Sequence, residues 1–574
     1  MNEVEPSLPK HDSTFLGHPR GLYILFLTEM WERFSYYGMR GLLVVYLTQH
    51  FLFSDDKSSY LYGTYTALVY VMTVVGGVLA DRYLGARKAV TFGAILLTLG
   101  HLGMAFEGTG SRQLVNYDGT DYQIILDGRG GNARQQIVTA QGMSYITFSD
   151  SEMKIEAAEA VGLPTTIERN QLTFRIETES FYLNALYLSL ALIIAGVGFL
   201  KANISTIVGA LYDFGDTRRD SGFTIFYMGI NLGAFLASIF CGYLGIVHGW
   251  RYGFGLAGIG MLFGLLIFIR YNSMLEGKSE PPSVEKLRQT VVWFINVEWL
   301  CYLSGVGIVG LSMFLVMNEE LVGGILGPLG VLMFIFMVGY ALISLKGVER
   351  SRMLAAMYFI LAQIPFWALF EQAGSSLNLF TARLVDRVIL GWSVPGPVFQ
   401  SLNAGFIFLF APLMAWLWIG LAKKNLNPST PVKFSLGVAM AGLGFLVLVA
   451  GMKGSGTAAL TPVLFIFLIY WIHTIGELMV SPVGLSVVTK LAPANMVGMT
   501  MGAWFLYSGI SNFLAGIIAR STGAETIGGQ ITNIAVAKAG YIEVYSHVGF
   551  IAIGIAVAML IVSPLVSKMM HGAD

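Results

Sequence analysis

Two acidic residues and two arginines lie in a stretch that is long and apolar enough to cross a membrane. The stretch covers residues 21–47, and its charged residues are Glu29, Glu32, Arg33 and Arg40. A spanning helix needs about 20 residues, and each charge near its centre costs roughly 2.5–3.5 kcal/mol. At about 100° per residue, these four side chains share one arc of a helix with Tyr36 and Tyr37. We expect this arc to face a water-filled pathway rather than only to join helices through charge pairs.

Three further ionisable residues lie within other apolar runs. Lys201 lies in residues 181–211, Glu371 in residues 351–378, and Glu477 in the run LIYWIHTIGELMVSP. A buried charge without a partner is costly, so we expect opposite charges at similar depth to pair. From the residues alone, such a pair could be a structural salt bridge or part of a binding site.

The composition places the whole chain in a membrane. Hydrophobic residues make up 55% of the chain and charged residues only 12%, and there are 68 glycines, which membrane helices tolerate well. We count about fourteen apolar segments of spanning length, one of them at about 290–316. The net charge is zero, which gives no indication of nucleic-acid binding. The polar N-terminal residues lack the apolar core of a secretory signal, so we expect no cleavage.

The charges of the short loops predict the orientation of the chain. Loops with several basic residues alternate with loops that have fewer, and the basic loops contain Arg82, Arg87, Lys88, Arg218, Arg219, Lys423 and Lys424. By the positive-inside rule these loops are cytoplasmic. An even number of crossings then places both termini in the cytoplasm.

One long polar segment, residues 107–180, interrupts the series of apolar runs. It contains short stretches of alternating apolar and polar residues, such as YQIIL and MSYITF, between Gly and Asp clusters. This alternation is typical of strands, so we expect a small β-rich insert, on the outer face by topology. Because it carries none of the charged residues described above, we expect it to be dispensable for the main activity.

Features of enzymes and of ATP-driven pumps are missing from the sequence. It has no Ser–His–Asp order, no Walker loop and no metal-ligand spacing. We therefore expect no enzymatic activity, no metal site and no cofactor.

Five runs resemble known transporter motifs. Residues 76–88, GGVLADRYLGARK, resemble the loop signature of the major facilitator superfamily. The other four resemble motifs of the proton-dependent oligopeptide transporter family, a group within that superfamily. They are EMWERFSYYG from Glu29, GVGFLKANIS at 196–205, FTIFYMGINLGAF at 223–235 and GELMVSPVGLS at 476–486. The chain departs from the family pattern at Ala202 and Ala404, where proline is common, which affects helix geometry rather than site chemistry.

The resemblance implies an all-α membrane protein of the major facilitator fold, with two six-helix bundles and two extra helices of the kind found in bacterial members. The expected divisions are a cytoplasmic tail (1–20), an N-terminal bundle (21–271) with the extracytoplasmic insert (107–180), a linker with two extra helices (272–350), a C-terminal bundle (351–567) and a second cytoplasmic tail (568–574).

The function that the resemblance implies is proton-coupled import of di- and tripeptides by alternating access across a bacterial inner membrane. Protons serve as the coupling ion, and the protein is expected to act as a monomer. Two alternatives stay open: a relative that carries nitrate or another small anion, and a membrane peptide sensor that does not transport.

The site residues follow from the motif positions together with peptide chemistry. A peptide has an ammonium group at one end and a carboxylate at the other, so Glu477 suits the first, and Arg33, Arg40 and Lys201 suit the second. The complete expected peptide-binding set is Arg33, Tyr36, Tyr37, Arg40, Tyr70, Lys201, Asn231, Trp367, Glu371, Asn403, Glu477, Ser481, Trp504 and Phe505. The expected proton-coupling residues are Glu29, Glu32, Arg33, Lys201 and Glu371, with Lys201 paired to Glu371. The expected gating loop contains Asp81, Arg82 and Arg87.

Overall fold

Long helices make up most of the computed structural model, which describes residues 14–129, 133–213 and 216–573. Within these ranges, each apolar run forms a helix of 20 residues or more. The helices are α1 (Arg20–Gln49), α2 (Asp55–Leu79), α3 (Gly85–Met104), α5 (Ser180–Ala210), α6 (Arg219–Val247), α7 (Trp250–Tyr271), α9 (Val297–Met317), α10 (Glu319–Ser344), α11 (Gly347–Phe370), α13 (Ser401–Lys423), α14 (Thr430–Gly454), α15 (Leu464–Leu491), α16 (Val497–Arg520) and α17 (Ile534–Met570).

Most of these helices are apolar enough to cross a membrane. Among the described residues, twelve helical stretches meet the requirements of length and composition. One of them, Asp55–Met104, contains both α2 and α3, which are joined by a π-helical turn at Ala80–Leu84. Helix α1 is not among the twelve, because its charged residues fall in the middle of its length. It is nevertheless almost entirely buried, so the other helices cover its charges.

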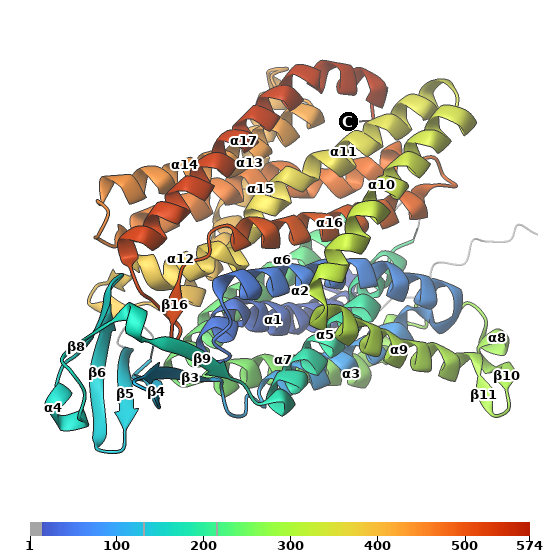
Figure 1. Cartoon of the computed structure of the whole chain (residues 1–574). Helices are drawn as coiled ribbons and strands as arrows, with labels where there is room; N and C mark the ends of the chain where they lie inside the picture. Colours follow the sequence, from blue (N-terminus) through green and yellow to red (C-terminus); the bar gives the residue numbers. More distant parts are fainter. Residues whose placement is uncertain (1–13, 130–132, 214–215, 574) are drawn as a thin grey trace, which may run out of the picture.

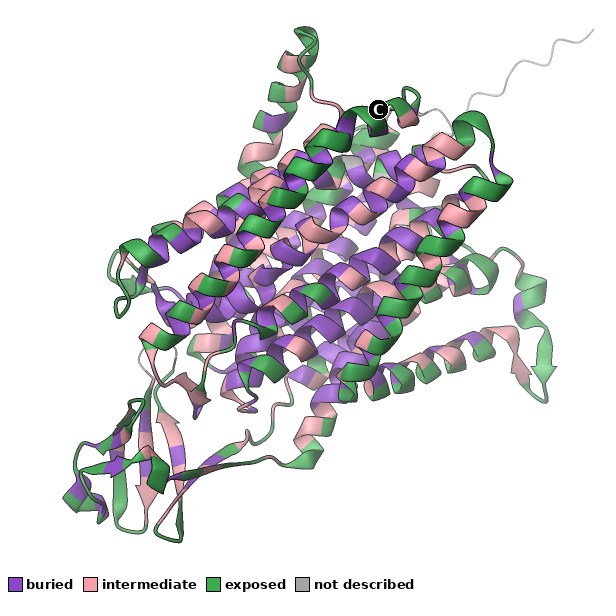
Figure 2. Ribbon diagram, turned by 45° about the horizontal axis from the view of Figure 1, so that its top comes forward, coloured by how far each residue is buried: buried purple, intermediate pink, exposed green. Residues whose placement is uncertain are grey.

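The helices pack as two groups, a first group of α1, α2, α3, α5, α6 and α7 and a second group of α11 to α17. In the first, α1 packs along α6 and α7, and α3 along α5; in the second, α14 packs along α15 and α17. Figure 1 shows the first group in blue and green below the second in yellow and red. Each group has its own large core of buried apolar side chains, and Figure 2 shows the buried residues between the helices. The groups touch where α2 packs on α16, and a Cβ atom on Gly63 would lie 2.7 Å from the Cα atom of Gly516.

Two helices, α9 and α10, come between the two groups in the chain, and they lie on the outside of this arrangement. Helix α9 packs on α5, and α10 packs on α11 and α16, while many of their apolar side chains are exposed. The sequence favoured a helix from residue 290, but α9 begins at Val297. Residues Thr290–Val292 (β10) and Ile295–Asn296 (β11) form a hairpin instead. The Asn296 side chain then caps α9 by accepting a hydrogen bond from the Trp299 backbone N–H at 2.9 Å.

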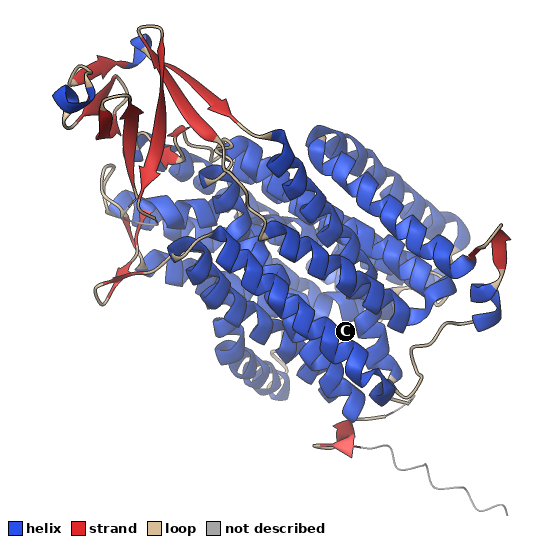
Figure 3. Cartoon of the chain, turned by 90° about the horizontal axis from the view of Figure 1, so that it is seen from below, coloured by secondary structure: helices blue, strands red, loops and turns tan. Residues whose placement is uncertain are grey.

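The insert between α3 and α5 is a seven-stranded antiparallel sheet, which confirms its predicted β-rich character. Its strands are β3 (Arg112–Tyr117), β4 (Thr120–Asp127), β5 (Arg134–Thr139), β6 (Gly142–Phe148), β7 (Glu152–Ile155), β8 (Thr166–Glu168) and β9 (Thr173–Glu177), in the order β8-β7-β6-β5-β4-β3-β9. A short helix, α4 (Ala158–Val161), packs on β6. Figure 3 shows these strands beyond one end of the helices, which we call the insert end.

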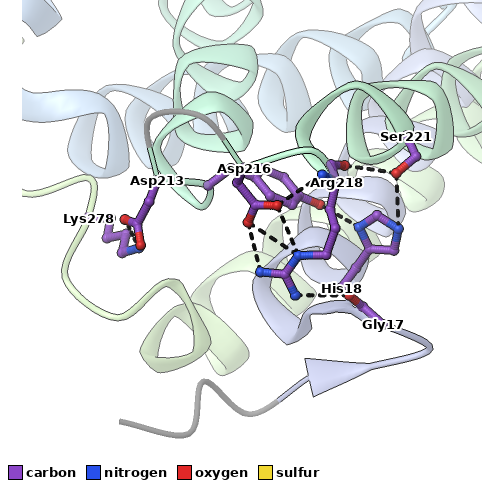
Figure 4. A network of polar contacts seen from close by, with 8 residues as sticks. Gly17, His18, Asp213, Asp216, Arg218, Ser221 and Lys278 are labelled. Carbon is purple, nitrogen blue, oxygen red and sulfur yellow. Dashed lines mark hydrogen bonds and ion pairs between the residues drawn. The ribbon is translucent and has the colours of Figure 1, made fainter. Parts of the chain in front are cut away.

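The first described residues form a small hairpin. Strands β1 (Thr14–Phe15) and β2 (His18–Pro19) pair just before α1. One ring nitrogen of His18 lies 2.8 Å from the Tyr212 hydroxyl, and Arg218 donates to the Gly17 carbonyl at 3.1 Å and to Asp216 (Figure 4). These contacts hold the start of α1 to the connection between α5 and α6.

The expected limits of the two tails need adjustment. The N-terminal tail was expected to cover 1–20, and residues 1–13 of it lie outside the described residues. At the other end, α17 continues to Met570, so the helix ends three residues later than expected. Residue 574 also lies outside the described residues.

Candidate substrate-binding site

A cavity of about 310 Å³ lies between the two helix groups. This volume falls within the range of small-molecule sites in proteins. Helices α1, α2, α5 and α6 of the first group line it, together with α11, α13 and α15 of the second. Its predicted residues are Glu29, Arg33, Tyr37, Arg40, Tyr70, Lys201, Asn231, Trp367, Glu371, Asn403, Glu477 and Ser481.

The charged residues of α1 form a compact buried cluster. The Arg33 guanidinium lies 3.0 Å from the Glu29 carboxylate and also contacts the Glu32 carboxylate. All three side chains are buried. Because Glu29, Glu32 and Arg33 lie within about one helical turn, two acids share one guanidinium. A proton on one acid therefore leaves Arg33 to the other or to a ligand.

Arg40 on α1 joins the two helix groups inside the cavity. Its guanidinium contacts the Glu371 carboxylate and the Tyr62 hydroxyl, and all three side chains are buried. Glu371 begins the 3₁₀ turn Glu371–Gly374 that follows α11. The long, forked arginine side chain reaches this turn from α1 and can hold two oxygen partners at once.

The expected pairing of Lys201 with Glu371 is therefore wrong for this structure. Lys201 lines the same cavity, but its Nζ atom lies 4.1 Å from the centroid of the Tyr70 ring. Glu371 instead forms an ion pair with Arg40, which extends from α1 in the other helix group. Residue type and depth gave the two charges correctly, but the partner depended on where each side chain pointed.

Glu477 on α15 is held by one neutral donor, the Asn403 side chain. Its carboxylate accepts a hydrogen bond from the Asn403 amide at 2.7 Å, and the same amide lies 3.1 Å from the Thr474 hydroxyl. None of the ion pairs between described residues includes Glu477, so its charge is available to an incoming cation. Asn403 was expected in the peptide-binding set, and here its side-chain nitrogen donates to Glu477.

A second, smaller cavity of about 150 Å³ adjoins the first. We call the first cavity the charged chamber and the second the side chamber. Tyr70, Trp367 and Ser481 line both cavities, which makes them the border between the two. Trp504 and Phe505 line only the smaller one, together with Ser508 and Asn512. Trp504 and Phe505 thus belong to the side chamber, whereas Tyr37, Tyr70 and Trp367 are aromatic walls of the charged chamber itself.

Two predicted site residues line neither of these cavities. Glu32 and Tyr36 are both buried but lie behind the residues that line the charged chamber. Tyr36 packs edge-on against Tyr37, with ring centroids 5.4 Å apart, and lies beneath the Arg33 guanidinium at 5.3 Å. On α1, Tyr37 and not Tyr36 faces the charged chamber. Tyr36, which was expected in the peptide-binding set, therefore lines neither cavity in this structure.

Several lining residues were not predicted from the sequence. Tyr227, Phe370, Gln400 and Tyr470 all line the charged chamber. Tyr227 lies one turn before Asn231 in the FTIFYMGINLGAF run, so helical spacing alone could have identified it. Gln400 precedes the first residue of α13 and donates to the Gly41 carbonyl of α1 at 3.3 Å. No pattern in the sequence predicts this contact.

The expected gating loop lies at the opposite end from the insert. Asp81 and Arg82 are exposed in the π-helical turn between α2 and α3. Arg87 makes two hydrogen bonds to Glu280, at 2.6 and 2.9 Å. Gly85, between Arg82 and Arg87, has φ of +72°, a conformation that favours glycine, and a Cβ atom there would lie 2.8 Å from the Glu280 carbonyl oxygen.

At the insert end the two helix groups are joined by ion pairs. Arg383 in α12 (Ser376–Leu384) lies 2.7 Å from Asp55 at the start of α2, and both side chains are buried. Arg520 lies 3.4 Å from Asp56, and the Asn378 amide donates to the Gly41 carbonyl at 2.8 Å. The structure therefore shows the groups closed against each other at this end.

Comparison with known proteins decides the family. The PTR2 model, described as POT family, matches residues 87–534. The chain belongs to the POT family. It is 34% identical to the uncharacterized transporter YclF of Bacillus subtilis, over 97% of this chain and 96% of the relative. It is 33% identical to the peptide transporter YePEPT of Yersinia enterocolitica, over 90% of each.

Solved structures agree with this assignment. A crystal structure of a mutant peptide transporter POT in complex with alafosfalin matches with a TM-score of 0.74 and 30% identity, over 98% of each chain. A POT family transporter in complex with 5-aminolevulinic acid matches with a TM-score of 0.72 and 28% identity, over 97% of this chain and 98% of the other. The expected major facilitator fold with additional helices is confirmed, and the protein is a multi-pass membrane transporter of this family.

Proposed function

We propose that this POT family member is a proton-coupled symporter that imports di- and tripeptides by alternating access. The observation that carries the proposal is the chamber between the two helix groups, where cationic and anionic side chains line one space with aromatic walls. The names of its relatives, which include peptide transporters and dipeptide and tripeptide permeases, support the same substrate class.

The charges of the chamber suit the two ends of a peptide. Glu477 is held by Asn403 and is not neutralised by a protein cation among the described residues, so it can accept a peptide ammonium group. Arg33 and Lys201 lie on helices of the other group and can receive the carboxylate. The constant ends of the substrate are thus bound by charge, which leaves its side chains to the aromatic walls and the side chamber.

Proton coupling is assigned to the α1 cluster and to Glu371. A proton on Glu29 or Glu32 changes the number of charges that compete for Arg33, and so changes its availability to a peptide carboxylate. A proton on Glu371 weakens its contact with Arg40, which joins the helix groups inside the chamber. Local charge changes of this kind can bias an element that has two arrangements.

The energy available from protons is sufficient for accumulation. Each proton that moves inward supplies about 2.3 kcal/mol per 100 mV of membrane potential, and a pH gradient adds roughly 1.4 kcal/mol per unit. One proton per peptide therefore suffices for a concentration ratio of an order of magnitude or more. Protons are the coupling ion in this proposal, and no other cofactor is required.

The proposed orientation places both termini and the Asp81–Arg87 loop in the cytoplasm, and the insert outside a bacterial inner membrane. The basic loops noted in the sequence support this assignment. One chain supplies the complete chamber, so the proposed functional unit is a monomer.

Direct binding measurements test the substrate class. Calorimetry or thermal-shift titration with dialanine, trialanine and nitrate should show binding of both peptides and none of nitrate. Saturable binding of nitrate without binding of peptide would instead favour an anion carrier.

A further inference from the structure

The insert is fixed to the first helix group. It begins a few residues after α3 and ends just before α5. The Ser111 backbone N–H donates to the His50 carbonyl at the end of α1 at 2.8 Å, and the Ser111 hydroxyl lies 2.6 Å from that of Thr178. These contacts join both ends of the insert to each other and to α1, so the insert follows the movements of the first group.

The same insert also binds the connection between α16 and α17, which belongs to the second group. This connection contains a small hairpin, β16 (Thr526–Ile527) and β17 (Gln530–Ile531), and Figure 1 shows β16 reaching the insert. Arg169 donates to both carboxylate oxygens of Glu525, at 2.6 and 3.1 Å. The Asn533 amide donates to Asp150 at 2.7 Å.

An apolar contact lies at the centre of this interface. The Ile527 side chain is only 4% exposed and belongs to the core of the insert, where it joins Val115, Ile124 and Ile137. Gln135 of the insert donates to the Ile527 backbone carbonyl, and Gln113 accepts from the Gly528 N–H at 3.4 Å. A buried apolar side chain surrounded by satisfied polar groups has the composition of a specific interface.

The turn of this hairpin is shaped for its position. Gly528 and Gly529 have φ of +54° and +78°, which favour glycine. A Cβ atom on Gly529 would lie 3.1 Å from the Thr48 carbonyl of α1. The hairpin is therefore inserted between the insert and the end of α1, both of which move with the first group.

We propose that the insert is a latch whose partner is the α16–α17 hairpin: it holds the two helix groups together at the insert end and releases the hairpin when that end opens. The proposal rests on the alternating access of the proposed function, because opening this end must separate the groups. It also refines the expectation that the insert is dispensable. The insert lines neither the charged chamber nor the side chamber, so its removal should change the balance between conformations rather than the binding of substrate.

Distances between spin labels test the latch directly. One label is placed at Lys57 in the first turn of α2, and the other at Leu390, which is fully exposed in the hairpin between β13 (Val388–Ile389) and β14 (Trp392–Ser393) of the second group. The two native cysteines, Cys241 and Cys301, are buried and stay in place. Pulsed electron paramagnetic resonance then reports the fractions of short and long distances at the insert end in nanodiscs.

The variants Ile527→Ala and Arg169→Ala should both raise the ratio of long to short distances, with the Ile527 variant raising it roughly tenfold because it loses buried apolar area. The matched control is Arg175→Ala, which removes an ion pair within the insert, to Asp121 at 3.0 Å. It should leave the ratio unchanged. Exchanging the charges in Arg169→Glu with Glu525→Arg should restore the wild-type ratio. Wild-type distances in the Ile527 and Arg169 variants would overturn the latch.

A reversible cross-link gives a second, independent test. Arg169→Cys and Glu525→Cys are joined by a short reducible thiol cross-linker in proteoliposomes. The linked protein should lose peptide uptake and regain it after reduction, because the latch can no longer release. Wild-type uptake with complete linkage would overturn the proposal. A wild-type protein that carries no peptide would refute the proposed function instead, and the label distances would still decide the latch.

Discussion

Asn403 on α13 donates a hydrogen bond of 2.7 Å to the carboxylate of Glu477 on α15. Both residues line the charged chamber, and the contact joins two helices of the second group. It fixes the position of an acid that has no cationic partner among the described residues. Asn403 is thus a positioning residue for the contact that we assign to the ammonium end of a peptide.

The first prediction concerns that contact. Glu477→Gln should weaken the binding of free dialanine by much more than the binding of N-acetylated dialanine. The lost charge-assisted hydrogen bond is worth about 1.5–3 kcal/mol, and only the free peptide has an ammonium group. Competition assays with both peptides measure the difference, and Glu349→Gln, an exposed acid at the start of α11, is the control. Equal losses for both peptides would rule out this role of Glu477.

The second prediction separates the two possible partners of Glu371. Arg40→Met and Glu371→Met should each destabilise the protein strongly, by about 3–5 kcal/mol, since each leaves a buried charge unpaired. The double variant should recover part of this loss. In contrast, the effects of Lys201→Met and Glu371→Met should be additive. Unfolding measured in detergent provides both cycles, and coupling between Lys201 and Glu371 alone would contradict the observed pairing.

The third prediction concerns coupling to protons. Glu29→Gln or Glu32→Gln should abolish accumulation of peptide under a pH gradient. With only one carboxylate left, protonation can no longer shift Arg33 from one acid to the other. Exchange of peptide for peptide needs no net proton movement, so it should survive at least in part. Uptake under a gradient is compared with counterflow in the same liposomes. Gradient-driven accumulation at wild-type rates in both variants would assign these acids a structural role.

The fourth prediction concerns pH at the latch. Hydrogen bonds from Arg169 lower the pKa of Glu525 below its ordinary value of 4.5. A lowered carboxylate pKa stabilises the latched state above the ordinary pKa, and this contribution is lost as the pH falls through the lowered value. The fraction of long label distances should therefore rise only below about pH 4.5. Arg169→Ala should remove this dependence, and a wild-type dependence in that variant would exclude the Arg169–Glu525 pair as its source.

The sequence predicted the elements better than their contacts. Apolar run lengths gave the helices, and alternation gave the strands of the insert, because both patterns are local. The stretch 290–296 was missed, since a short apolar run reads equally well as a helix and as a strand. The partner of Glu371 depended on the direction of the Arg40 side chain across a chamber. The contact of Ile527 with the insert joins segments far apart in the chain, and no local pattern encodes it.

The most direct test of the account is uptake of labelled dialanine into liposomes that contain only this protein. With an acidic outside and a negative interior, peptide should accumulate at least about tenfold, as expected for one proton per peptide. A proton ionophore should abolish the accumulation, and unlabelled trialanine should compete. Equilibration without accumulation, or accumulation that the ionophore leaves unchanged, would contradict proton-coupled peptide import.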